Sequence, residues 1–161
     1  MVEVGDTAPE FCLPGGDEEE ICLKSYQGKW LVLYFYPRDN TSGCTREAVD
    51  FTAALPALRD LGAEVLGISR DSPASHKKFA EKHGLSVKLA SDQDHKVTEA
   101  YGAWALKKIY GKESYGVVRS TFQIDPQGKI ACIWRKVAVK GHVDAVIKSM
   151  QALGKGEGRT D

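Results

Sequence analysis

Residues 30–47 decide the fold, and they read Trp-Leu-Val-Leu-Tyr-Phe-Tyr-Pro-Arg-Asp-Asn-Thr-Ser-Gly-Cys-Thr-Arg-Glu. The run from 30 to 36 lacks polar alternation and is rich in aromatic and β-branched residues, a pattern typical of a strand buried on both faces. A polar segment follows and leads into a helix predicted from Cys44 to Leu61. Cys44 therefore lies where a central strand gives way to a helix N-terminus, and the free backbone N–H groups there favour a thiolate over a thiol.

The segments around this stretch predict an alternation of strands and helices. A hairpin is expected from residues 11–13 and 21–23. After residue 61 we expect a strand over 64–69, a helix over 73–83, a short strand over 87–90, a short helix over 94–101, a hairpin of strands 117–124 and 130–135, and a helix over 141–153. A parallel β-α-β half followed by an antiparallel β-β-α half predicts an α/β protein with a thioredoxin-like fold, carrying an N-terminal β-hairpin and an inserted helix.

Two segments interrupt this regular pattern. Pro56 falls inside the first predicted helix, and a proline there loses a hydrogen bond at a cost of about 3 kcal/mol. We therefore expect a kink near Thr52 or a break into two pieces. Residues 103–116 are basic and irregular in pattern, and we expect them to form a long connection.

Length and composition indicate one compact domain over residues 1–153, followed by a flexible C-terminal tail over 154–161. Lysine plus arginine equals aspartate plus glutamate at 22 each, so we expect neither a nucleic-acid nor a membrane partner. The first residues lack the pattern of a signal peptide, which favours a cytoplasmic protein. The histidines at 76, 83, 95 and 142 have no ligand spacing, and we expect no metal site and no cofactor.

The residues before Cys44 are suited to thiolate chemistry. Thr41 is expected to cap the helix, its hydroxyl accepting a hydrogen bond from the N–H of Cys44 while lying close enough to the sulfur to orient a polar substrate. Pro37 is expected to fix the backbone that leaves the strand and to shield the thiolate from water. A thiolate held among fixed donors attacks an O–O bond, and the product is a sulfenic acid.

The pattern Pro37-x-x-x-Thr41-x-x-Cys44 resembles the active-site motif of the peroxiredoxins. Residues 34–45 are similar to the bacterioferritin-comigratory, or peroxiredoxin Q, branch, and the resemblance extends over nearly the whole chain. It implies a thiol-dependent peroxidase that reduces hydrogen peroxide and alkyl hydroperoxides in antioxidant defence and redox homeostasis. It also implies that Arg119 is the active-site arginine, whose guanidinium would hold the thiolate and the peroxide oxygens. Members of this branch are often monomeric.

One position departs from that branch. Many members have a resolving cysteine five residues after the reactive one, where this chain has Val49. We therefore expect a one-cysteine enzyme whose Cys44 sulfenic acid is reduced by an external thiol, such as thioredoxin, glutaredoxin with glutathione, or a small thiol. Recruitment of Cys12, Cys22 or Cys132 as a resolving thiol is the alternative.

The remaining cysteines also have structural interpretations. Cys132 is expected to act as a small buried hydrophobe in its strand. Cys12 and Cys22 face each other across the predicted N-terminal hairpin. There we expect two free thiols in a reducing compartment, with a cross-strand disulfide as the alternative.

Two other classes of function share the reactive cysteine. A thioredoxin-like disulfide reductase needs a second cysteine beside the first, and position 41 is threonine. Reduction of insulin disulfides without peroxide would identify that class. A redox sensor or holdase would keep Cys44 but react once, and repeated turnover with dithiothreitol excludes it.

Overall fold

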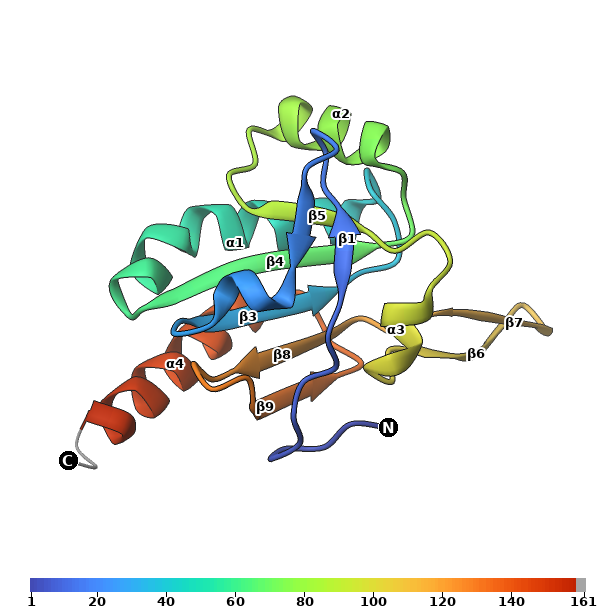
Figure 1. Ribbon diagram of the computed structural model, residues 1–161. Helices are drawn as coiled ribbons and strands as arrows, with labels where there is room; N and C mark the ends of the chain where they lie inside the picture. Colours follow the sequence, from blue (N-terminus) through green and yellow to red (C-terminus); the bar gives the residue numbers. More distant parts are fainter. Residues whose placement is uncertain (159–161) are drawn as a thin grey trace.

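A computed structural model describes the backbone of residues 1–158 and the side chains of these residues except Ile109 and residues 154–158. The chain runs through the elements labelled in Figure 1. In order they are β1 (Cys12–Pro14), β2 (Glu20–Cys22), a 3-10 helix η1 (Leu23–Tyr26), β3 (Trp30–Phe35), α1 (Ser42–Asp60), β4 (Ala63–Ser69), α2 (Pro73–His83), β5 (Lys88–Ser91), α3 (Lys96–Ala100), β6 (Trp104–Ile109), β7 (Lys112–Val117), β8 (Ser120–Ile124), β9 (Ile130–Arg135) and α4 (His142–Gly158).

A five-stranded mixed sheet forms the centre of the molecule, in the order β5-β4-β3-β8-β9. Strands β3, β4 and β5 are parallel, whereas β8 is antiparallel to both β3 and β9. All six residues of β3 are buried, as the unbroken apolar run predicts for a central strand. The parallel and antiparallel halves meet at β3, and this confirms the thioredoxin-like α/β fold.

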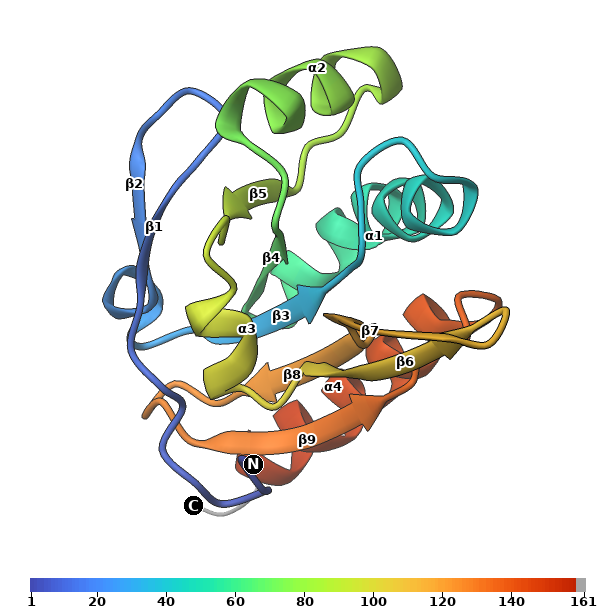
Figure 2. The same ribbon diagram turned by 90° about the vertical axis from the view of Figure 1, so that its right-hand side faces the viewer.

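Each face of the sheet has its own hydrophobic core. One face packs against α1 and α4, where Phe51, Leu58 and Val146 are fully buried. The other face is covered by the N-terminal hairpin, α3 and the start of β6, and Phe35 there contacts the ring of Tyr101. Figure 2 shows the helices α1 and α4 on one side of the sheet, with β1, β2 and α3 on the other. The alternating side chains of β3 thus serve both cores.

Helix α1 is continuous from Ser42 to Asp60 with Pro56 inside it, so the alternative of a break into two pieces is wrong. Phe51, Leu55 and Leu58 bury one face of this helix against the sheet. Burial of side chains of this size stabilises by about 1.5–3 kcal/mol each, which exceeds the cost of one proline. Packing therefore holds the helix together through the missing hydrogen bond.

Residues 103–116 do not form the irregular connection expected from the sequence. They form most of the antiparallel hairpin β6–β7, in which Lys107 pairs with Ser114 and Ile109 with Lys112. Tyr110 and Gly111 between the strands both have positive φ, 53° and 77°, as a tight two-residue hairpin turn requires. Figure 1 shows this hairpin projecting from the body of the molecule.

The C-terminal helix is longer than predicted. Helix α4 continues to Gly158, although the sequence indicates an end near residue 153. The remaining residues 159–161 of the expected tail lie outside the described part of the chain, and the single-domain organisation over 1–153 stays a prediction. Within residues 1–158, no helix combines the length and the apolar character needed to cross a membrane.

Candidate active site

Cys44 and Arg119 lie together although they are 75 positions apart in sequence, with Arg119 Nη2 donating to Cys44 Sγ over 3.2 Å. The sheet explains this proximity, because the last residue of β3, Phe35, pairs with the first residue of β8, Ser120. The chain leaving β3 toward α1 and the chain entering β8 therefore meet at one edge. Cys44 is 1% exposed, so the guanidinium meets a sulfur that is shielded from water.

Thr41 is the N-cap residue of α1, but its hydroxyl does not make the predicted bond. The Thr41 hydroxyl donates to the carbonyl of Arg38 over 3.0 Å, so the expected acceptance from the Cys44 N–H is wrong. The Thr41 carbonyl accepts the first helical hydrogen bond, from the N–H of Thr45 at 2.9 Å. Thr41 thus closes the turn before the helix. Pro37 lies exposed in the same segment, and its shielding role stays a prediction.

Glu47 is a third member of the site that the sequence interpretation missed. Its carboxylate accepts from Arg119 Nη1 over 2.5 Å and is fully buried. Burial raises the pKa of Glu47 to about 7, and the Arg119 charge opposes that shift. Among the described residues, its second oxygen Oε2 has no hydrogen-bond partner. Because Glu47 lies three positions after Cys44, helical spacing places both on one face and could have identified it.

The positive charge of Arg119 affects several neighbours. His142 accepts or donates a hydrogen bond with the Thr121 hydroxyl at 2.8 Å, and burial lowers its pKa to about 4, with Arg119 adding to the effect. Lys107 on β6 also has a lowered pKa, because of partial burial and the Arg119 charge, while Cys44 opposes the shift. His142 is therefore neutral near pH 7. The cation that contacts the Cys44 sulfur is the Arg119 guanidinium.

A buried polar network anchors the segment that precedes Cys44. Asp39 accepts hydrogen bonds from the Tyr36 hydroxyl at 2.7 Å and the Ser75 hydroxyl at 2.8 Å. His76 Nδ1 lies 2.8 Å from Asp39 Oδ2, and its Nε2 lies 3.1 Å from the carbonyl of Ala90. Both ring nitrogens of His76 therefore lie within hydrogen-bond distance of oxygen atoms, and the ring links Asp39 to the carbonyl of Ala90. The Asp39–His76 pair fixes the loop between β3 and α1 onto α2 and β5.

Comparison with known proteins agrees with this geometry. Residues 4–133 match the AhpC/TSA family. The chain belongs to this family of peroxiredoxins. It is 44% identical over 154 residues to the peroxiredoxin Bcp of Bacillus subtilis, covering 96% of this chain and 98% of that protein. It is 40% identical over 146 residues to the peroxiredoxin Bcp of Escherichia coli, covering 91% and 94%.

Solved structures give the same assignment. The bacterioferritin comigratory protein of Xanthomonas campestris superposes on this peroxiredoxin with a TM-score of 0.88 and 40% identity, over 96% of this chain and 98% of that one. A cysteine-to-serine mutant of Xylella fastidiosa PrxQ gives a TM-score of 0.89 at 37% identity, over 94% and 97%. The protein is therefore a peroxiredoxin of the Bcp/PrxQ type, a thiol-dependent peroxidase that reduces peroxides.

The other cysteines of this peroxiredoxin lie away from the Cys44–Arg119 contact. Cys12 and Cys22 form a disulfide, so the expectation of two free thiols is wrong. The hairpin register pairs these two residues directly, with their Cα atoms 4.0 Å apart, which brings the sulfurs within bonding reach. Cys132 is free and half-buried on β9, opposite Gln123. Val49 is 41% exposed on α1.

Replacing Asp39 should test the buried anchor. The Asp39→Asn variant removes a buried carboxylate oxygen that contacts both the Ser75 hydroxyl and His76, and we expect a loss of about 3 kcal/mol in the free energy of unfolding, measured with urea. Asp50→Asn is the matched control, because Asp50 forms an exposed ion pair with Arg46 on α1 and should cost less than about 1 kcal/mol. Equal losses in the two variants would contradict the assignment of Asp39 as the buried anchor of this loop.

The ionisation of Glu47 should make stability depend on pH. Because its pKa is raised from 4.5 to about 7, the folded state binds the proton more tightly, and the Glu47 contribution to the free energy of unfolding falls as pH rises through this window. The fall should be on the order of 3 kcal/mol. Glu47→Gln keeps the side-chain size and an acceptor for Arg119 but does not titrate. Urea unfolding from pH 5 to 8 should show the wild type losing stability relative to this variant. Parallel dependences of stability on pH in the two proteins would disprove the raised pKa of Glu47.

Proposed function

We propose that Cys44 is the nucleophile of the peroxidase and that Arg119 activates it. The hydrogen bond from Arg119 Nη2 to the Cys44 sulfur carries this proposal. The thiolate attacks one peroxide oxygen, a sulfur–oxygen bond forms and the O–O bond breaks. The departing oxygen leaves as hydroxide or alkoxide and takes a proton to give water or an alcohol. Cys44 becomes a sulfenic acid.

The donors around the sulfur determine how fast this step proceeds. Arg119 is positioned to follow the negative charge as it moves from sulfur to the departing oxygen, because its guanidinium presents several N–H groups in one plane. Glu47 holds Arg119 Nη1, so the Nη2 group stays directed at Cys44. We assign Thr41 and the Cys44 backbone N–H to the peroxide oxygens, and Pro37 to the conformation of the loop. Glu47 is thus a positioning residue.

Both hydrogen peroxide and alkyl hydroperoxides are proposed substrates. Alkyl peroxide reduction activity is described for the X. campestris bacterioferritin comigratory protein, whose fold this chain shares over nearly its full length. The attack step needs only the O–O bond and a leaving oxygen within reach of Arg119, so it accepts an alkyl group on the far oxygen. The physiological setting is proposed to be antioxidant defence in the cytoplasm.

We also propose a one-cysteine cycle completed by an external thiol. Val49 occupies the position of a nearby resolving thiol, and Cys12 and Cys22 are already bonded to each other. An external thiol attacks the sulfenic sulfur and releases water, and a second thiol then displaces the mixed disulfide and restores Cys44. Because Cys44 is 1% exposed, the first turn of α1 must open before this attack. Thioredoxin, glutaredoxin with glutathione, or a small thiol would serve as the reductant of a monomeric enzyme.

Removal of the nucleophile or of its donor should affect peroxide consumption to different extents. Cys44→Ser should abolish turnover, because serine lacks a reactive thiolate. Arg119→Ala should slow oxidation by about 10²-fold or more, the usual effect of one lost transition-state donor. Stopped-flow measurement of peroxide loss checks both, with Cys132→Ser as a control that keeps the wild-type rate. Substantial turnover by Cys44→Ser would refute the proposal.

The one-cysteine cycle makes a distinct prediction for mass spectrometry. After one equivalent of peroxide and no reductant, the intact wild-type chain should gain one oxygen, as a sulfenic acid does. Val49→Cys should instead lose two hydrogens relative to its reduced form at this step, because a thiol five residues away can join Cys44 once the helix start unwinds. A net loss of two hydrogens in the wild type instead, with a new disulfide at Cys44, would show that a native cysteine resolves the sulfenic acid.

A further inference from the structure

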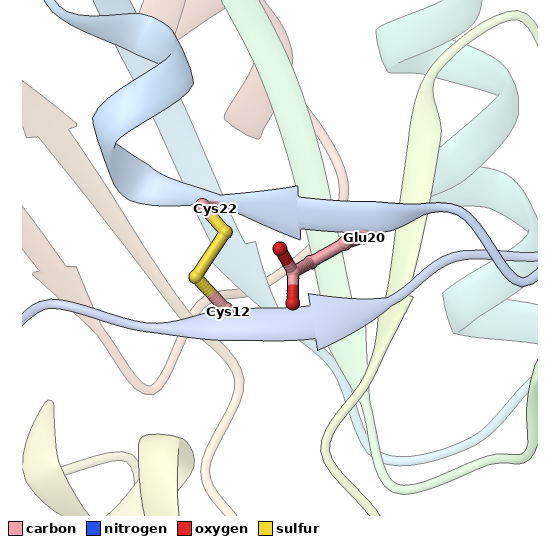
Figure 3. A group of neighbouring side chains, drawn as sticks. All are labelled: Cys12, Glu20 and Cys22. Carbon is pink, nitrogen blue, oxygen red and sulfur yellow. A yellow bond between two sulfur atoms is a disulfide. The ribbon is translucent and has the colours of Figure 1, made fainter.

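Cys12, Glu20 and Cys22 form a compact cluster on one face of the N-terminal hairpin, away from the Cys44 site. Glu20 precedes Cys22 by two positions on β2, so both side chains leave the same face of the strand, and Cys12 lies directly opposite Cys22 on β1. The two sulfurs and a carboxylate oxygen lie within 4.8 Å of one another. Figure 3 shows the Glu20 carboxylate directed into the space between the strands, beside the disulfide.

The hairpin backbone holds this arrangement independently of the sulfur–sulfur bond. At one end Leu23 donates its N–H to the carbonyl of Phe11 over 3.1 Å, and at the other Gly15 donates to Glu19 over 2.8 Å. Ile21 points to the opposite face of the strand and is buried in the core that covers the sheet. Reduction of the disulfide would therefore leave two thiols and a carboxylate gathered at one place.

These three groups match the ligand preferences of a borderline-soft divalent cation. Thiolates bind Zn²⁺ strongly, a carboxylate oxygen is a common companion ligand, and a water can complete four-coordination. Without a cation, two thiolates beside Glu20 would place three negative charges within a few ångströms, and their mutual repulsion opposes that state. A divalent cation removes the repulsion. Cys12 and Glu20 are exposed and Cys22 is half-buried, so an ion can reach the cluster from solvent.

We propose that the reduced hairpin is a Zn²⁺-binding site with Cys12, Cys22 and Glu20 as ligands, and that the disulfide is the metal-free, oxidised state of the same site. Oxidation by peroxide consumes two electrons from the two metal-bound thiolates. The sulfur–sulfur bond forms, the peroxide takes up two protons and yields water and an alcohol (two waters from hydrogen peroxide), and Zn²⁺ is released. The substrate of the enzyme thus controls the occupancy of a second site. This proposal does not depend on the role of Cys44.

Cobalt binding tests the proposed ligands in the full-length chain. In a Cys44→Ser background, protein reduced with a phosphine and kept anaerobic should bind one Co²⁺ with a thiolate-to-metal charge-transfer absorption, and Zn²⁺ should displace it. Cys12→Ser and Cys22→Ser should abolish this absorption. Glu20→Gln should weaken Zn²⁺ binding about tenfold or more. Glu18→Gln, an exposed carboxylate in the same hairpin loop, is the matched control and should bind like the parent.

Circular dichroism of each variant verifies that the fold is intact. Absence of the charge-transfer absorption from the reduced, folded parent would overturn the proposal, as would its persistence in both serine variants. Peroxide added to the Zn²⁺-loaded parent should release the metal, detected with a chromogenic chelator, while the count of free thiols falls by two. Retention of the metal after peroxide treatment would refute its control by oxidation.

Discussion

The contact between the Arg119 guanidinium and the Cys44 sulfur is the interaction on which the site depends, and it exists because β3 and β8 are neighbours. Cys44 follows the end of β3 and Arg119 precedes the start of β8, so both residues lie at the same end of these paired strands. The sulfur is buried, so the guanidinium interacts with it at a lower dielectric than bulk water provides. The strand pairing at the centre of the fold therefore also brings together the two residues of the proposed catalytic pair.

Buried ionisable groups are concentrated around the chain that leaves β3. Glu47 and Arg119 form one pair beside the sulfur, and Asp39 with His76 forms another beneath the preceding loop. Buried pairs cost desolvation energy, and hydrophobic residues in their place would often be no less stable. What the pairs provide is position. The loop and the first turn of α1 are held by contacts to α2, β5 and β8, which fixes where the sulfur lies relative to its donors.

The sequence was sufficient for the fold class, the order of most elements and the position of Cys44, because apolar runs and a spaced motif indicate these directly, whereas Arg119 was expected only from the resemblance to the peroxiredoxins. The hairpin β6–β7 was missed because its strands lack a regular alternation of apolar and polar residues and its turn at Tyr110 and Gly111 lacks the usual Asn-Gly signal. The Cys12–Cys22 pairing across the hairpin was expected, but two free thiols were favoured because a reducing compartment was assumed, whereas the structure has the disulfide. The Thr41 hydroxyl could have bonded either to the Cys44 N–H or to a nearby carbonyl, and in the structure it donates to the carbonyl of Arg38.

In the cycle proposed above, the near-complete burial of Cys44 would set two events in competition. A sulfenic acid enclosed by helix α1 waits for that helix to fray before a bulky reductant gains access, whereas a second small peroxide needs much less room. A second oxidation gives a sulfinic acid, which ordinary thiols do not reverse. In that cycle, the tightness of the first helical turn would determine the peroxide concentration at which the enzyme inactivates itself. A substitution that loosens this turn would slow the attack on peroxide and make the enzyme more resistant to over-oxidation.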